Sequence, residues 1–172
     1  PDNSIKIYNV ANGVLLKTFL GHSKPVSDIA WSPNGVKIAS ASYDKTVKIW
    51  LDSTGLEQYT LIGHTDSISC IGFSKDSKRI ASGSYDGTIK IWHSDSGTIL
   101  RTLTSHTNKV NSISWCPDGR LASCSIDKTI KIWDAGSGGV IRTISTNNAI
   151  PSTVTFSSDG STIAVQLSAA LD

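Results

Sequence analysis

The stretch from residue 63 to residue 92 contains the three residue types that nucleophilic hydrolysis requires. They are His64, Ser82 and Asp86. A serine can attack a carbonyl carbon, a histidine can take the proton of the serine, and an aspartate can orient the histidine. A hydrolase is therefore the first hypothesis for this chain. Because a catalytic triad is needed only once, the hypothesis depends on whether the same set occurs elsewhere.

The same set recurs along the chain at a nearly constant spacing. Gly21-His22 returns 42 residues later as Gly63-His64, and 42 residues after that as Ser105-His106. "SASYDKTVKIW" at 40–50 returns as "SGSYDGTIKIW" at 82–92 and as "SCSIDKTIKIW" at 123–133. The third unit is one residue shorter, in the turn "CPDGR". A period of this length is typical of a repeat architecture.

Each repeat unit is predicted to form four β-strands, which we call a to d in chain order. In the first full unit they are expected at about 25–31, 36–41, 46–50 and 56–62. These runs are rich in Val, Ile, Thr and Trp, are bounded by turn residues, and show no helical period. Four short antiparallel strands per unit fit a propeller blade, whose sheet must bury both faces against its neighbours.

Composition narrows the classes of protein and partner. The chain has 172 residues, of which 38% are hydrophobic, and a net charge of +2. This small charge argues against nucleic acid or an anionic membrane as the main partner. No apolar run approaches the roughly 20 residues needed to cross a bilayer, and no secretory signal is recognisable, so a cytoplasmic or nuclear protein is expected.

Metal, disulfide and cofactor sites are not expected from the sequence. Cys70, Cys116 and Cys124 are odd in number and lack CxxC spacing, which predicts reduced thiols rather than a disulfide framework or a zinc site. No phosphate-binding glycine loop and no pair of carboxylates with acid–base spacing is present, so no cofactor is predicted.

The units resemble WD40 repeats, which open with Gly-His and close near a tryptophan. The usual Trp-Asp ending is present at Trp133-Asp134, whereas Trp50-Leu51 and Trp92-His93 depart from it. The resemblance implies an all-β propeller with a buried, hydrogen-bonded tetrad of histidine, serine, aspartate and tryptophan in each blade. Carried over by position, the tetrads are His22, Ser40, Asp44 and Trp50; His64, Ser82, Asp86 and Trp92; and His106, Ser123, Asp127 and Trp133.

This tetrad interpretation is preferred to the hydrolase hypothesis. Three identical active sites at one spacing on a small chain would be unusual, whereas one structural brace in each blade is expected of a repeat. Each polar group in such a chain has a partner, which makes its burial tolerable.

The repeat pattern divides the chain into half a blade, three blades and half a blade. The units are 1–20 (strands c and d), 21–62, 63–104, 105–145 and 146–172 (strands a and b). In the last unit Asn148, Val165 and Ala169 stand near the histidine, serine and aspartate positions.

The two half blades are complementary, which leaves three arrangements open. The chain could close on itself as a four-bladed ring, which the wedge angle of such blades disfavours. Two copies could form an eight-bladed ring, or the remaining blades could lie on a longer polypeptide. Because open blade faces and strand edges favour aggregation, we expect that the chain is not a free monomer.

For function, the resemblance implies a non-catalytic scaffold that binds other proteins across one face of the ring. The family's contact positions flank the first apolar residue of strand a and precede the tetrad aspartate. In this chain they are Pro25, Ser27, Tyr43, Ser67, Ser69, Tyr85, Lys109, Asn111 and Ile126, with Ile150 and Ser152 as weaker candidates. Alternatives are a regulatory or sensor repeat segment of a larger multidomain protein and, less favoured, a hydrolase of propeller fold.

The nature of the partner is suggested by the charges around two of these positions. Tyr43 and Tyr85 occupy matching places beside Lys45, Lys109 and Lys128. Aromatic side chains surrounded by lysines favour an acidic or phosphorylated peptide as the partner.

Overall fold

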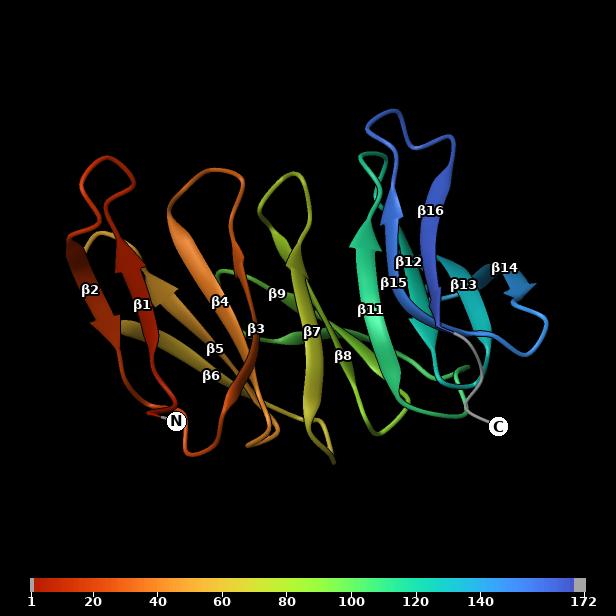
Figure 1. The fold of residues 1–172 in the computed structure, drawn as a ribbon, viewed down its shortest axis with the longest axis horizontal. Helices are drawn as coiled ribbons and strands as arrows, with labels where there is room; N and C mark the ends of the chain where they lie inside the picture. The colour runs from red at the N-terminus through yellow and green to blue at the C-terminus, as the bar shows by residue number, and fades with distance from the viewer. Residues whose placement is uncertain (1, 169–172) are drawn as a thin grey trace.

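The structure is a computed structural model that describes residues 2–168. In this range the chain forms sixteen β-strands in five antiparallel sheets that stand side by side in a curved row (Figure 1). These sheets confirm the prediction of an all-β fold built from four-stranded blades. Among the described residues, no helix is long and apolar enough to cross a membrane.

Three of the sheets are complete blades with the strand order a-b-c-d. The first contains β3 (Val26–Trp31), β4 (Lys37–Ser42), β5 (Thr46–Leu51) and β6 (Glu57–Ile62). The second contains β7 (Ile68–Phe73), β8 (Arg79–Ser84), β9 (Ile89–His93) and β10 (Ile99–Leu103). The third contains β11 (Val110–Trp115), β12 (Arg120–Ser125), β13 (Thr129–Asp134) and β14 (Val140–Ser145). In the first blade the predicted strand bounds are within one residue of the observed ones.

The two remaining sheets have two strands each. Strands β1 (Ile5–Tyr8) and β2 (Leu15–Phe19) are the c and d strands of a half blade, and β15 (Ile150–Phe156) and β16 (Ile163–Ser168) are the a and b strands of another. The two half blades lie toward opposite ends of the row (Figure 1). Within residues 2–168, β1 pairs only with β2 and β16 only with β15, so the chain does not close into a four-bladed ring. Ala169, expected at an aspartate position, lies outside the described residues.

The hydrophobic core lies between neighbouring blades. Val47 and Ile49 of the first blade pack in one cluster with Ile68, Ile80 and Trp92 of the second. A similar cluster joins the second blade to the third, and a smaller one joins the third blade to β15 and β16. The two central strands of each complete blade, b and c, are therefore covered on both faces, and even their serines are buried.

The antiparallel order places two kinds of turn on opposite edges of the row. The turns between strands a and b form one edge, which we call the a–b edge, and lie at the top in Figure 1. The turns between strands b and c form the other, which we call the b–c edge. Tyr43 and Tyr85 lie on the b–c edge, because each directly follows strand b of its blade.

Candidate functional site

In the second blade, the four tetrad side chains form one chain of hydrogen bonds. Trp92 donates its Nε1–H to Ser82 Oγ over 2.9 Å. Ser82 Oγ lies 2.9 Å from His64 Nε2, and His64 Nδ1 lies 2.9 Å from Asp86 Oδ2. One tautomer satisfies every contact, with the serine hydroxyl donating to Nε2 and the Nδ1–H donating to the carboxylate. The serine, histidine and aspartate thus have the relative geometry of a catalytic triad.

The other two blades repeat this chain. The distances from histidine to aspartate, from histidine to serine and from tryptophan to serine are 2.8, 2.8 and 2.9 Å in the first blade. They are 2.7, 2.7 and 2.8 Å in the third. The twelve residues predicted from the repeat pattern are therefore brought together in the three expected groups.

The tetrad serines have no access to a substrate. Ser40, Ser82 and Ser123 are each 0% exposed, and the Oγ of each already accepts the indole N–H. A nucleophile needs open space in front of its oxygen for the carbonyl that it attacks. The arrangement is therefore suited to bracing strand c against the loop that enters the blade.

Hydrogen bonds keep the tetrad carboxylates ionised. Burial alone would raise the pKa of Asp86, but hydrogen bonds from His64, Thr88 and the Thr65 backbone lower it well below its usual range. The pKa values of Asp44 and Asp127 are lowered by the same set of contacts. Burial lowers the pKa of His106, which favours the neutral imidazole that the tetrad requires.

The predicted contact residues on the b–c edge lie close together. The backbone N–H groups of Tyr43, Tyr85 and Ile126 donate to the carbonyls of Pro25, Ser67 and Lys109 respectively, over 3.0, 2.9 and 3.0 Å. This pairing places the residue before each tetrad aspartate next to the start of strand a in the same blade.

Tyr43 and Tyr85 form an aromatic pair, and the positively charged Lys109 lies against it. The rings of Tyr43 and Tyr85 meet edge to face with centroids 6.1 Å apart, and both are exposed. The Lys109 ammonium lies 4.1 Å from the Tyr85 ring centroid and donates to the Tyr85 hydroxyl over 2.9 Å. We call Tyr43, Tyr85 and Lys109 the aromatic patch; it spans three blades.

Three other predicted contact residues instead join neighbouring blades. Ser27 Oγ donates to the Ile68 carbonyl over 2.7 Å, and Ser69 Oγ donates to the Val110 carbonyl. Asn111 Nδ2 donates to the Pro151 carbonyl over 2.8 Å. Sequence reasoning missed this role, although a small polar residue at the same place in each unit was a visible signal. The weaker candidate Ser152 donates to the Gln166 carbonyl within its own half blade, where Ile150 faces Ser168.

The cysteines are thiols that the fold shields from solvent. All three are free and buried. Burial raises the pKa of Cys70 and of Cys124 to about 12, so both stay protonated at neutral pH. Among residues 2–168, no three His, Cys, Asp or Glu side chains are grouped so that they could hold a metal ion.

A comparison with protein families finds the model described as "WD domain, G-beta repeat" three times in this chain. The matches cover residues 13–50, 55–93 and 97–134, which together make up more than half of the sequence. Each match contains strand d of one blade followed by strands a, b and c of the next. One sequence repeat therefore spans two neighbouring blades and includes the histidine and the tryptophan of one tetrad.

Proposed function

Because the chain belongs to the WD40-repeat family, whose members generally mediate protein–protein interactions, we propose that it is a non-catalytic scaffold that binds a peptide on its b–c edge. The observation that carries this proposal is the aromatic patch. Its rings are exposed, yet they are attached to turns that the tetrads hold in place. Tyrosine contributes large contact area and a polar end at low cost in conformational entropy, and it is enriched among residues that dominate binding energy.

The charges around the aromatic patch favour an acidic or phosphorylated peptide. Lys45 and Lys128 stand on the same edge as Lys109, whereas Asp66 is an acidic side chain close to Tyr85. At the surface these lysines outnumber Asp66, because the tetrad carboxylates Asp44 and Asp86 expose only 7% and 9% of their side chains. An acidic ligand would place its negative charge beside Lys109 and its neighbouring apolar side chains against the tyrosine rings.

The test is a binding screen of the whole chain against acidic and phosphorylated peptides, followed by variants. Tyr43→Ala combined with Tyr85→Ala is expected to weaken the best ligand at least tenfold, with folding checked by circular dichroism. Leu56→Ala is the control, because Leu56 is an exposed apolar residue of the first blade in the c–d turn, away from the aromatic patch. Unchanged affinity in the double variant would contradict the proposal.

The exposed ends of the row support a second proposal, that further blades cover them. Ile29 and Trp31 on β3 are 52% and 50% exposed, whereas their counterparts Ile71 and Phe73 on β7 are 7% and 9% exposed. The difference arises because β7 packs against strands a and b of the preceding blade, and β3 has no such strands before it within the described residues.

A second copy of the chain, placed head to tail, would supply the missing strands. Strands β15 and β16 of one copy would complete β1 and β2 of the other, giving an eight-bladed ring. The N-terminal half blade already has the required turn geometry: Asn3 has φ 53° and Asp2 Oδ1 accepts from the Ser4 N–H. The first full blade has the same turn geometry: Lys45 has φ 72°, and Asp44 Oδ1 accepts from the Thr46 N–H.

Light scattering tests this second proposal independently of any ligand. The expected mass is about twice the 18.3 kDa of one chain. Trp31→Lys, at the exposed end, is expected to shift the mass toward that of one chain, and Lys75→Glu at a remote exposed site is the control. A well-folded wild-type protein at the mass of a single chain would refute the head-to-tail ring.

A further inference from the structure

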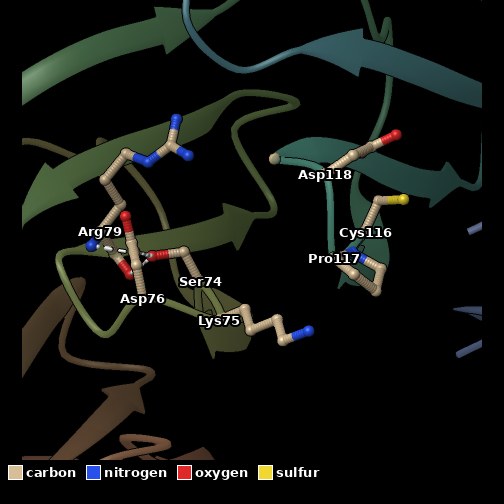
Figure 2. A pocket seen from close by; sticks show the side chains of 8 residues that line it. Ser74, Lys75, Asp76, Arg79, Cys116, Pro117 and Asp118 are labelled. Atoms are coloured by element: carbon tan, nitrogen blue, oxygen red, sulfur yellow. Dashed lines mark hydrogen bonds between the residues drawn. The ribbon is translucent and has the colours of Figure 1, made fainter. Parts of the chain in front are cut away.

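A pocket of about 270 Å³ lies on the a–b edge, whereas the aromatic patch lies on the b–c edge. Figure 2 shows the side chains that line the pocket. It is formed by the a–b turn of the second blade, residues 74–79, and the a–b turn of the third blade, residues 116–119. The second turn is the one that the sequence shortens by one residue. The charged side chains that line this pocket are two cations, Lys75 and Arg79, and two carboxylates, Asp76 and Asp118.

The Arg79 guanidinium is held in place but lacks a hydrogen-bond acceptor. It lies over the Trp115 ring at 4.9 Å from the ring centroid. Within residues 2–168, no group accepts a hydrogen bond from its side chain and no carboxylate forms an ion pair with it. The hydrogen bonds of Arg79 to Ser74 involve the Arg79 backbone, and in Figure 2 no dashed line reaches either its guanidinium or the Lys75 ammonium.

Comparison with the preceding blade shows what is missing. Lys37 occupies the position of Arg79 in the first blade, and its Nζ donates to Asp95 Oδ1 over 2.6 Å and to the Ser94 carbonyl over 2.8 Å in the second. One blade further along, the residue at the Asp95 position is Gly136. The repeat therefore keeps the cation and removes the carboxylate that would have accepted its hydrogen bond. Asp76 and Asp134 remain close enough for the charge of Arg79 to lower their pKa, but neither accepts a hydrogen bond from it.

The acidic side chains near the pocket are already engaged elsewhere. Asp118 accepts from Arg120 Nε over 2.7 Å, Asp76 accepts from the Lys78 backbone over 3.0 Å and from Ser74, and Asp134 accepts from the Gly136 backbone over 2.8 Å. Arg120, the next copy of Arg79, is satisfied by Asp118 and by the Gly160 carbonyl. Arg79 is thus the cation of this series that has no acceptor among the described residues.

We propose that this pocket is a second binding site, which takes the carboxylate of an acidic peptide side chain on Arg79. A guanidinium presents two parallel N–H groups that match the two oxygens of a carboxylate. Stacking on Trp115 orients the Arg79 guanidinium before the ligand binds, which reduces the conformational entropy lost on binding. Lys75 adds a second positive charge at the rim. The site does not depend on the aromatic patch, and the two could be occupied together.

A peptide titration followed by NMR tests the site. The ligand is N-acetyl-Glu-Glu-amide, added to the whole ¹⁵N-labelled chain, and N-acetyl-Gln-Gln-amide is the uncharged control. Saturable shifts are expected at residues 74–79 and 116–119 and at the Arg79 Nε–H, for the glutamate peptide alone. Shifts confined to the b–c edge, equal shifts with the glutamine peptide, or tighter binding of inorganic phosphate would each overturn the proposal.

Three variants separate recognition by Arg79 from general charge. Arg79→Met keeps a long side chain over Trp115 and is expected to weaken the glutamate peptide at least tenfold, whereas Arg142→Met, at an exposed arginine on β14, is expected to leave the affinity unchanged. Gly136→Asp places a carboxylate at the Asp95 position without removing Arg79, and its Cβ, 3.2 Å from Asp134 Oδ1, requires only a small shift of that side chain. It is expected to weaken the peptide at least fivefold by competing for the guanidinium. Normal affinity in both Arg79→Met and Gly136→Asp would refute the site.

Discussion

Ser82 Oγ lies 2.9 Å from His64 Nε2, the separation between a nucleophile and its general base, yet Ser82 is 0% exposed. The same three residue types can therefore serve two purposes, and solvent access decides between them. In a hydrolase the serine faces a cleft and the hydrogen-bond chain moves a proton. Here the Trp92 N–H donates to the Ser82 oxygen and leaves no room for a substrate. The chain of hydrogen bonds therefore holds strand c against the loop that enters the blade.

Replacing Ser82 with alanine is expected to lower stability. The substitution removes two hydrogen bonds and leaves the Trp92 N–H and His64 Nε2 buried without partners. The expected loss is about 2 kcal/mol in the free energy of unfolding, since an unsatisfied buried group costs about 1–3 kcal/mol. Urea denaturation measures it, with Ser53→Ala at an exposed c–d turn as the control. Equal stability of the two variants, or ester hydrolysis that depends on Ser82, would contradict the structural role.

The blades and their tetrads could be predicted from the sequence because each depends on a residue type that repeats in register. His64, Ser82 and Trp92 lie far apart in the chain, but their copies at the same spacing show that they belong to one unit. The bounds of the strands could be predicted for the same reason, because the turn residues between them recur at the same spacing as the tetrads.

Contacts between blades could not be predicted in the same way. Ser27 looked like a residue on an open face, but its hydroxyl donates to the next blade, and repetition alone does not show in which direction a side chain points. The pocket at Arg79 depends on a difference between repeats, the change from Asp95 to Gly136. That change has meaning only when the register between blades is known.

Acidification is expected to destabilise the fold in two stages. His106 has a folded-state pKa below its usual 6.5, so the unfolded chain binds more protons and stability falls as the pH drops below about 6.5. The folded-state pKa is below 3.8 for all three tetrad carboxylates, Asp44, Asp86 and Asp127. Above about pH 3.8 these ionised carboxylates stabilise the fold, and this stabilisation is lost progressively as the pH falls below that value. Burial raises the pKa of Asp28, which works in the opposite direction.

Urea midpoints measured from about pH 8 to about pH 3 check this dependence. Asp127→Asn is expected to flatten the acidic part of the curve, because its side chain no longer titrates. A wild-type midpoint that stays constant or rises toward low pH would contradict the assignment.

Gly83 is expected to be intolerant of even one added carbon atom. A Cβ built there would lie 2.6 Å from Cys70 Sγ and 2.8 Å from Val110 Cγ1, where the second and third blades meet. Overpacking of this kind typically costs about 1–3 kcal/mol. Gly83→Ala should therefore lower the thermal midpoint, and adding Cys70→Ala should recover part of the loss by removing the sulfur.

Gly72→Ala is the matched control for that experiment. Gly72 lies in the same sheet, and a Cβ there would lie 3.6 Å from Trp115, an ordinary contact. It is expected to be neutral or slightly stabilising, because alanine restricts the unfolded chain more than glycine does. If Gly83→Ala were as stable as Gly72→Ala, the blades would have to be packed less closely than described.

The two tyrosines of the aromatic patch are expected to ionise at different pH values. The hydrogen bond from Lys109 lowers the pKa of Tyr85, whereas contact with Tyr85 raises the pKa of Tyr43. A titration followed by ¹³Cζ NMR shifts should therefore show Tyr85 ionising first, and Lys109→Met should raise its pKa. An acidic peptide that engages Lys109 would also raise the pKa of Tyr85, because it takes up the ammonium and adds negative charge. If Lys109→Met left the pKa of Tyr85 unchanged, Lys109 would not be held against Tyr85 in solution. The aromatic patch would then lack the positive charge on which the proposal of an acidic ligand depends.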